Sequence, residues 1–459
     1  MSVTPNFSHF KIEGLRGIRD IDVRIDNNTL ILVGENGSGK TTFLRILFYF
    51  LSGRWLSLAQ FDFTKLTATI NGHAYSVSYE DVKNAVQPLD ERTLSRLPPS
   101  QRRRVADLIE IGRIEQAEAL LVHYGIRMGY PSSKQREFAL AATDSSVKAL
   151  TDLHERLVKT LSAQILYLPT YRRIERELGS IIQGVDPDEM RRQAPILPQA
   201  EDASDYVELV EFGMNDVKNA IDATLEDIRT FQLHGATRLT LSYLGDVVSQ
   251  KYLSTDRDTI ASASEETIEA VLNRIDKTIL SADHKSHLRD IIIAAKTTAK
   301  VTSEHEKIIY HYFTKLLNFQ KELQAKELNI RQFCNLCSGY ITDKKFVYES
   351  AKFSFNIKSS HKEGDIALSD LSSGEKQIVS LFSHVYLSGR KNFFVLIDEP
   401  ELSLSVPWQR RFLTDIRDAS FCAGLIAVTH SPFIYDNKLR PNTHALGEFV
   451  SGADWGNIS

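Results

Sequence analysis

Residues able to bind phosphate lie close together near the start of the chain. The segment Gly34-Glu-Asn-Gly-Ser-Gly-Lys-Thr41 has the spacing G-x-x-x-x-G-K-T and follows the apolar run Leu30 to Val33. Glycine lacks a Cβ, so the backbone can turn tightly there and aim successive N–H groups at phosphate oxygens. Lys40 adds a positive charge, and Thr41 begins a helix whose N-terminus favours an anion. This context predicts a phosphate-binding loop rather than a turn that binds nothing.

We expect the whole loop and the first turn of the helix to contact the phosphates of one nucleotide. The expected nucleotide-binding residues of this segment are Gly34, Glu35, Asn36, Gly37, Ser38, Gly39, Lys40, Thr41 and Thr42. The Thr41 hydroxyl is also suited to a Mg²⁺ ion that is bound to phosphate.

Acidic residues and a histidine follow two later apolar segments. Residues 392–399 read Asn-Phe-Phe-Val-Leu-Ile-Asp-Glu and predict a buried strand that ends in two carboxylates. In a chain with a phosphate loop, these fit Mg²⁺ binding by Asp398 and water activation by Glu399. A further predicted strand, 424–429, is followed by His430. A lone histidine is more often structural, but beside these segments it predicts a contact with the phosphate end of the ligand.

A second segment suited to an anion opens a helix in the C-terminal part of the chain. Leu371-Ser-Ser-Gly-Glu-Lys-Gln377 precedes the helical run that begins at Ile378. Serine and glycine at a helix start offer a hydroxyl and unhindered amides. Ser372, Ser373 and Gly374 are therefore candidate nucleotide-binding residues.

Composition limits the class of protein. A chain of 459 residues exceeds the size of one ordinary core, so we expect one large divided domain or two domains. Apolar residues make up 42% and charged residues 25%, which is ordinary for a globular protein. A net charge of −4 and a pI near 6.4 do not favour nucleic-acid binding overall. Three cysteines, no membrane-spanning run and no signal peptide predict a cytoplasmic location with no membrane partner.

The elements that position these residues can be read in part from apolar spacing. Alternation predicts strands within 7–25 and a hairpin within 63–78 that turns at Asn71-Gly72, then short helices over 81–162 and a buried strand at 165–168. Helical spacing then runs from Tyr206 through Val217 and onward to about residue 330. Its heptads are short and irregular, which predicts against a long coiled-coil arm.

These patterns predict three parts. Residues 1–178 would be the N-terminal half of a nucleotide domain, with a helical segment at 81–162. Residues 179–340 would be a helical insertion for oligomerisation or partner docking, and 341–459 would complete the nucleotide domain.

Three other features have two interpretations each. Cys334-x-x-Cys337 has the spacing of a zinc half-site, but no second pair lies nearby, so free thiols are favoured. Arg102 to Arg104 are more typical of a solvated helix face than of a nucleic-acid site. Arg172 and Arg173, after the strand at 165–168, could face a ligand.

Taken together, the four segments resemble the ABC-type ATPase superfamily. Gly34 to Thr41 resembles its Walker A motif, Leu371 to Gln377 its signature, Phe394 to Glu399 its Walker B motif, and Thr429-His430 its switch histidine. The resemblance implies an α/β ABC-ATPase head, with a mixed β-sheet and a P-loop core, that carries the helical insertion.

The resemblance also implies ATP and Mg²⁺ as ligands and a head-to-tail dimer. ATP would lie between Lys40, Thr41, Asp398, Glu399 and His430 of one subunit and Ser372, Ser373 and Gly374 of the other, with Thr41 and Asp398 on the metal and Glu399 and His430 catalytic. Two positions depart from the pattern: Ser373 replaces the second signature glycine, and Ser405 stands where many relatives carry Asp.

Within the superfamily the chain resembles the SMC, RecF and OLD branch, of the AAA_15 type. The sequence continues for about thirty residues after His430, so we expect no C-terminal Toprim nuclease of the OLD type. The stretches 167–175 and 398–408 resemble the ATPase subunits of the PARIS and Septu anti-phage systems. That likeness implies a homo-oligomer that holds a separate Toprim-like or HNH effector nuclease, with a phage trigger protein.

Two other classes remain open. One is a RecF-like repair ATPase, with Arg102 to Arg104 and Arg172-Arg173 on DNA phosphates. The other is a transporter-associated or structural ATPase.

Overall fold

The computed structural model describes residues 5–85, 97–110, 117, 120–121, 145–169, 206–208, 214–254, 260, 262–274, 280–297, 303–361, 364–390 and 392–452. Arg172 and Arg173, and the other positions between these ranges, lie outside the described residues. The chain divides into two compact units, one formed by Met1–Glu211 with Arg390–Ser459 and the other by Phe212–Gly389.

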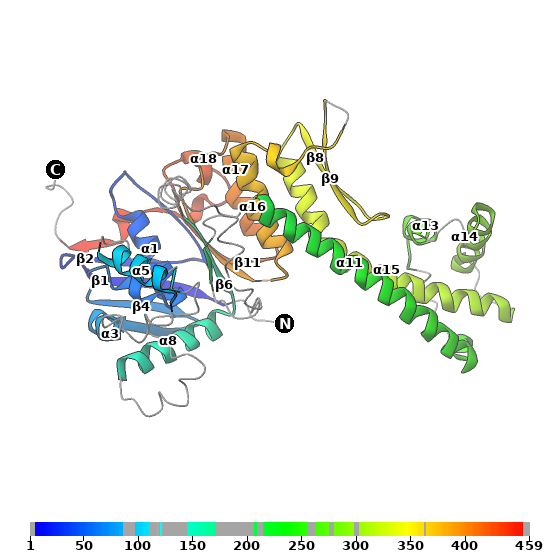
Figure 1. Cartoon of the computed structure of the whole chain (residues 1–459), viewed down its shortest axis with the longest axis horizontal. Helices are drawn as coiled ribbons and strands as arrows, with labels where there is room; N and C mark the ends of the chain where they lie inside the picture. Colours follow the sequence, from blue (N-terminus) through cyan, green and yellow to red (C-terminus); the bar gives the residue numbers. More distant parts are fainter. Residues whose placement is uncertain are drawn as a thin grey trace. The chain divides into compact units, whose positions relative to one another are not determined.

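The first unit contains two sheets, so the predicted α/β class is confirmed (Figure 1). The parallel sheet has the order β12 (Thr443–Ala445), β3 (Thr29–Val33), β11 (Cys422–Val428), β10 (Phe393–Asp398), β6 (Gln164–Leu168) and β7 (Tyr206–Glu208). The antiparallel sheet has the order β13 (Val450–Gly452), β2 (Arg19–Arg24), β1 (Phe7–Leu15), β4 (Lys65–Ile70) and β5 (His73–Ser78).

The turn between β4 and β5 shows how local sequence sets local structure. Asn71 and Gly72 have φ values of 53° and 79°, the left-handed region that asparagine and glycine tolerate best. Ile70 then pairs with His73, as the predicted hairpin requires.

Helix α1 (Lys40–Ser52) joins the two sheets through aromatic side chains. Phe10 of β1 lies 5.8 Å from Phe43 and 5.7 Å from Phe50, measured between ring centroids. Phe48, on the same helix, stacks on Tyr167 of β6 at 4.4 Å. These rings belong to one buried cluster with residues of both sheets, so the helix that begins at the phosphate loop is fixed by the main core.

Shorter helices complete the first unit. They are α2 (Trp55–Leu58), α3 (Tyr79–Ala85), α5 (Pro99–Glu110), α8 (Ser145–Leu161), α17 (Val406–Asp418) and α18 (Pro432–Tyr435), with 3-10 turns η3 (Arg440–Asn442) and η4 (Leu446–Phe449). The predicted helices of 81–162 are thus confirmed where the structure describes that segment. Arg102 to Arg104 lie on α5, where Arg103 is exposed and the Arg102 Nε donates to the Leu97 carbonyl at 2.8 Å.

One helix prediction was wrong. Tyr206 to Glu208 form strand β7, which pairs in parallel with β6 and aligns Tyr206 with Ile165. Three residues are too few to show a strand alternation, so only the neighbouring strand decides their conformation.

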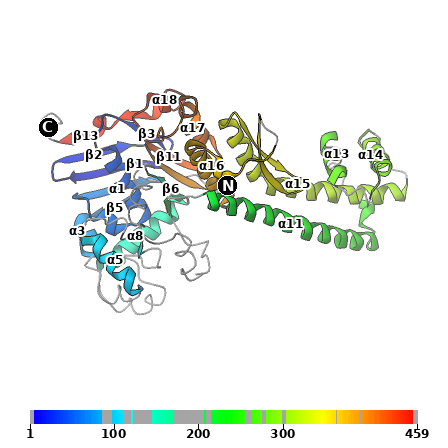
Figure 2. The same cartoon turned by 45° about the horizontal axis from the view of Figure 1, so that its top comes forward.

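The second unit is mostly helical. Its elements are α11 (Met214–Val248), η1 (Lys251–Ser254), α13 (Glu265–Arg274), α14 (Ala282–Thr297), α15 (Glu304–Tyr340), a hairpin of β8 (Lys344–Glu349) and β9 (Ser354–Ser359), η2 (Leu368–Asp370) and α16 (Ser373–Leu387). Figure 2 shows α11 and α15 running side by side, with α13 and α14 nearer the end at which α11 stops and α15 begins.

The expectation that the insertion has no long helical arm was wrong. Helices α11 and α15 have 35 and 37 residues and pack antiparallel along much of their length. Polar residues are buried on these two helices at Asp246, Gln320 and Glu327, and they interrupt the apolar heptad pattern. Gly235 hides it further, because a Cβ there would lie 2.1 Å from Cε2 of Phe319.

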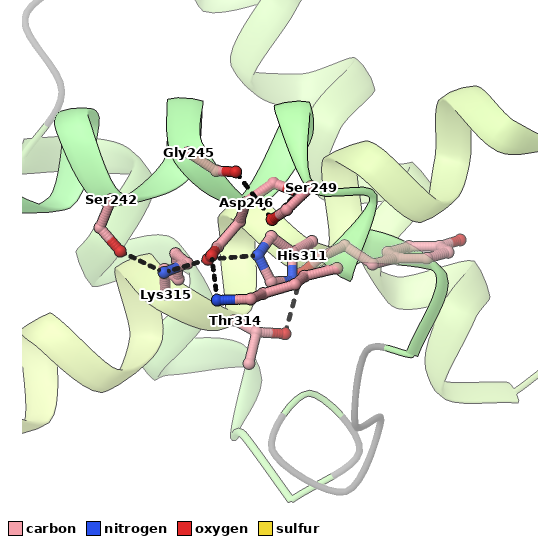
Figure 3. Close-up of polar contacts among 9 residues, drawn as sticks. Ser242, Gly245, Asp246, Ser249, His311, Thr314 and Lys315 are labelled. Atoms are coloured by element: carbon pink, nitrogen blue, oxygen red, sulfur yellow. Dashed lines mark hydrogen bonds and ion pairs between the residues drawn. The ribbon is translucent and has the colours of Figure 1, made fainter.

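A polar cluster ties α11 to α15 at the end near Asp246 (Figure 3). The Asp246 carboxylate accepts from His311 Nε2 at 3.0 Å and pairs with Lys315 Nζ at 2.6 Å and Lys251 Nζ at 3.3 Å. Lys315 also donates to the Ser242 hydroxyl at 2.7 Å. Lys315, and next His311, hold the pKa of the Asp246 carboxyl well below its usual range.

We predict that Asp246→Asn lowers the thermal midpoint of the chain at pH 7. A carboxyl with a depressed pKa stabilises the fold above its unfolded pKa of about 3.9, and this stabilisation is lost as the pH falls further. The gap in midpoint between wild type and variant, followed by circular dichroism, should therefore narrow below about pH 4. Asp227→Asn is the matched control, because its 3.1 Å pair with Lys326 is exposed. A gap that does not change with pH would contradict this role.

Candidate functional site

The phosphate loop connects β3 to α1 as the sequence predicts. Gly34 to Gly39 form the loop, and Lys40, Thr41 and Thr42 form the first turn of α1. Gly37 and Gly39 have φ values of 81° and 95°, which side chains with a Cβ rarely adopt. Gly39 is also the N-cap residue of α1, so the helix begins directly where the loop ends.

Lys40 lies buried against its own loop. Its Nζ donates to the Gly34 carbonyl at 2.9 Å, to the Glu35 carbonyl at 2.8 Å and to the Ser38 hydroxyl at 3.1 Å. Burial lowers the pKa of Lys40, while the nearby carboxylates oppose that shift. A phosphate at the loop would give this ammonium an anionic partner in place of carbonyls.

Two residues far apart in the chain are hydrogen-bonded at the N-terminus of α1. The Thr41 hydroxyl donates to Oδ1 of Asp398 at 3.1 Å, and Asp398 is almost fully buried at the end of β10. A hydroxyl and a carboxylate, completed by phosphate oxygens and water, are the donor set that Mg²⁺ prefers. The residues present therefore fit the predicted metal position.

Glu399 continues from Asp398 in a strained conformation. Its φ is 52°, in the left-handed region, and its N–H donates to the Val428 carbonyl at 2.9 Å. Burial raises the pKa of Glu399, and the neighbouring Asp398 and Glu401 charges raise it further. The raised pKa gives the Glu399 carboxylate a higher affinity for a proton than a free glutamate has, as suits a general base.

His430 follows β11, one strand away from Asp398. Its backbone N–H donates to Oε1 of Glu401 at 2.7 Å, and it lies close enough to Glu399 to oppose the rise in that pKa. Thr429 beside it is fully buried. The first unit thus brings the loop, both acids and the histidine together.

The predicted signature residues belong to the second unit. Ser372 caps α16: its hydroxyl accepts from the Glu375 N–H at 3.4 Å, and its own N–H donates to Glu375 Oε2 at 2.7 Å. Ser373 and Gly374 follow in the first turn. Lys344 of β8 pairs with Glu375 at 2.6 Å, which fixes the acid of this capping box.

Two side chains that hold the loop of His430 were not predicted from the sequence. Glu401 was overlooked, although an acid two residues after Glu399 in Asp-Glu-Pro-Glu is a usable signal. Gln409 of α17, which accepts from the Ser431 hydroxyl at 2.7 Å, gave no signal because nothing in its own segment indicates that contact. Ser405 is the N-cap residue of α17, and its side chain makes no capping hydrogen bond.

The metal interpretation of the cysteine pair gains no support. Cys334 and Cys337 are buried on α15, and burial raises the pKa of Cys334 to about 12. Across the described ranges, no three His, Cys, Asp or Glu side chains form a group that could hold a metal ion. Nor does any helix in the described part of the chain have the length and apolar character needed to span a membrane.

These features define a P-loop nucleotide-binding unit. A glycine loop follows one strand of a parallel sheet, a lysine and a threonine begin the next helix, and the acids lie at the end of a strand two positions away in the sheet. Comparison with protein families places residues 7–435 in the AAA ATPase domain family, AAA_15. The chain belongs to this family, and ATP is the ligand that the family implies.

Similarity to curated proteins is short. The chain is 43% identical over 49 residues to the DNA replication and repair protein RecF of Rickettsia canadensis, which is 11% of this chain and 14% of that protein. RecF of Rickettsia akari is 43% identical over 47 residues, 10% of this chain and 13% of the relative. The match thus spans about a seventh of the length of these relatives.

Two solved structures of Smc head domains align over most of the chain. The head of Pyrococcus furiosus, with an extended coiled coil and bound to the C-terminal domain of ScpA, has a TM-score of 0.36 and 13% identity over 94% of this chain and 92% of that one. The head of Pyrococcus yayanosii, with a coiled coil and joint, has a TM-score of 0.29 and 13% identity over 94% and 93%. The fold class rests on the strand order described above and not on these scores.

Proposed function

We propose that the chain hydrolyses ATP with Mg²⁺ at the site formed by Lys40, Thr41, Asp398, Glu399 and His430. The observation that carries the proposal is the 3.1 Å contact between Thr41 and Asp398, which joins the phosphate loop to the acidic strand end. Membership of the AAA ATPase domain family supports it.

Each residue has a separate task in this proposal. The loop amides and Lys40 bind the phosphates, and Thr41 with Asp398 holds the Mg²⁺ that neutralises phosphate charge when bound. Glu399 orients the attacking water and accepts its proton at a carboxylate oxygen. His430 contacts the γ-phosphate through its exposed side chain.

We further propose that two copies share each nucleotide. Ser372, Ser373 and Gly374 would contact the phosphates held by the other copy, because a capped helix start offers amides and a hydroxyl to an anion. The support is the resemblance of Leu371 to Gln377 to an ABC signature. Such dimers would form a larger homo-oligomer.

The biological role that we propose is anti-phage defence. The ATP-bound assembly would hold a separate effector nuclease, Toprim-like or HNH, and release or activate it when a phage trigger protein is sensed. This role rests on the resemblance of 167–175 and 398–408 to PARIS and Septu ATPase subunits. A cytoplasmic location follows from it.

The helical insertion, residues 179–340, is the proposed docking region. Leu233, Leu241, Leu244 and Val248 of α11 are 60–79% exposed, and their spacing puts them on one side of the helix. The buried residues Ile228 and Leu239 lie on the opposite side. An uncovered apolar stripe of this kind is typical of a protein-binding surface.

A RecF-like DNA-repair role is the alternative, and the short RecF match favours it. ATP hydrolysis that DNA stimulates, with an affinity that falls steeply with salt, would select it.

We predict that Glu399→Gln lowers ATP turnover about 100-fold or more, because a general base of this kind contributes that much. The variant should retain ATP and accumulate as an ATP-bound assembly, seen by mass photometry and by nucleotide extraction. Lys40→Ala is the control that loses nucleotide binding itself. Unchanged turnover in purified Glu399→Gln protein would refute the assigned role.

For the docking surface, we predict that Leu241→Ser with Leu244→Ser abolishes co-purification with the proposed effector nuclease, Toprim-like or HNH, and leaves ATP turnover unchanged. Ile18→Ser is the matched control, because Ile18 is an exposed apolar residue of the first unit. Undiminished co-purification of the double variant would show that the stripe is not the docking surface.

A further inference from the structure

The loop after Glu399 is bonded directly to the loop that carries His430. Glu401 is the connection: Oε2 accepts from the Thr429 hydroxyl at 2.7 Å, and Oε1 accepts from the His430 N–H at 2.7 Å. Each carboxylate oxygen therefore has its own donor, and both donors come directly after the end of β11.

Gln409 of α17 makes a second link between the same two loops. The Ser431 hydroxyl donates to Gln409 Oε1 at 2.7 Å, and Gln409 Nε2 donates to the Leu404 carbonyl at 2.9 Å. Ser431 in turn donates its N–H to the Thr429 hydroxyl at 3.0 Å. The loop of Glu399 to Leu404 and the loop of Thr429 to Ser431 thus form one hydrogen-bonded body.

The Glu401 side chain is not needed for its own turn. Backbone bonds close that turn, from Leu402 N–H to the Glu399 carbonyl at 3.2 Å and from Leu404 N–H to the Glu401 carbonyl at 3.1 Å. A side-chain substitution leaves these bonds available. What the carboxylate adds is the link to the histidine loop.

We propose that Glu401 is a positioning residue for ATP hydrolysis, which sets the His430 loop relative to Glu399 by accepting from Thr429 and His430 together. The inference rests on the proposed function, because it assumes that Glu399 and His430 act on ATP. It assigns to Glu401 no contact with the nucleotide. Its loss should therefore change the rate of the chemical step and leave binding nearly as it was.

Glu401→Gln tests the proposal with little change in shape. The amide keeps one oxygen to accept from the His430 N–H, and its N–H₂ faces the Thr429 hydroxyl, which must turn from donor to acceptor, so both charge-assisted bonds are lost. We expect kcat to fall about 10- to 100-fold, the usual effect of a hydrogen bond to a charged group. The dissociation constant for ATP should stay within about twofold, since the loop and Lys40 are untouched.

A double-variant cycle separates positioning from general damage. Thr429→Val removes the hydroxyl that donates to Glu401, and Thr429→Ser restores it. Because both changes break one contact, Glu401→Gln with Thr429→Val should be no slower than the slower single variant. Thr429→Ser should stay near wild type. Asp20→Asn is the matched control. The Asp20 carboxylate also accepts from a backbone N–H, that of Gly14 at 2.7 Å, but it lies in the antiparallel sheet, so this variant should keep full activity.

Three outcomes would overturn the inference while the ATPase proposal stands: unchanged kcat in Glu401→Gln, ATP binding and kcat that fall equally, or rate effects of Glu401→Gln and Thr429→Val that multiply independently. A wild-type chain without ATP turnover, or a Glu399→Gln variant with full turnover, would instead overturn the proposed function.

Discussion

The hydrogen bond from Thr41 to Asp398 is the constraint on which the first unit depends. It joins positions 357 residues apart and exists only if β3, β11 and β10 lie in that order and register. Leu425 to Val428 align with Thr29 to Leu32, and Val395 to Asp398 align with Leu425 to Val428, so the three strand ends stop at one level. The contact then also requires that α1 has a fixed orientation. Its aromatic contacts with both sheets fix that orientation.

The site contains buried charges and a strained backbone, both of which lower the stability of the fold. Lys40 and Asp398 are buried ionisable groups, and Glu399 has a left-handed backbone conformation, which costs on the order of 1–3 kcal/mol. These costs are offset by a single large core that contains residues of α1 and both sheets. A rigid core below a strained, polar strand edge is the usual arrangement for a site that must bind a charged ligand without rearranging.

Local features could be predicted from sequence, and features set by distant contacts could not. The phosphate loop, the Asn71-Gly72 turn and the buried strand before Asp398 depend on their own residues, and each was predicted. The strand β7 depends on pairing with β6, and the long helices carry buried acids, Asp246 and Glu327, whose partners include His311 of α15 and Tyr348 of β8. Glu401 was missed for the same reason, because its partners Thr429 and His430 are brought to it only by the sheet. The signature helix was predicted as an element, while its joint action with the phosphate loop remains a proposal.

The central claim is that each ATP is held by the loop of one copy and the signature of another. Mixing two inactive variants, Lys40→Ala and Gly374→Glu, tests it most directly. A mixed dimer would have one site built from the intact loop of the second variant and the intact signature of the first. With random pairing in two-fold dimers, about a quarter of wild-type ATP turnover should return. A mixture no more active than the separate variants, or full activity of Gly374→Glu alone, would contradict the claim.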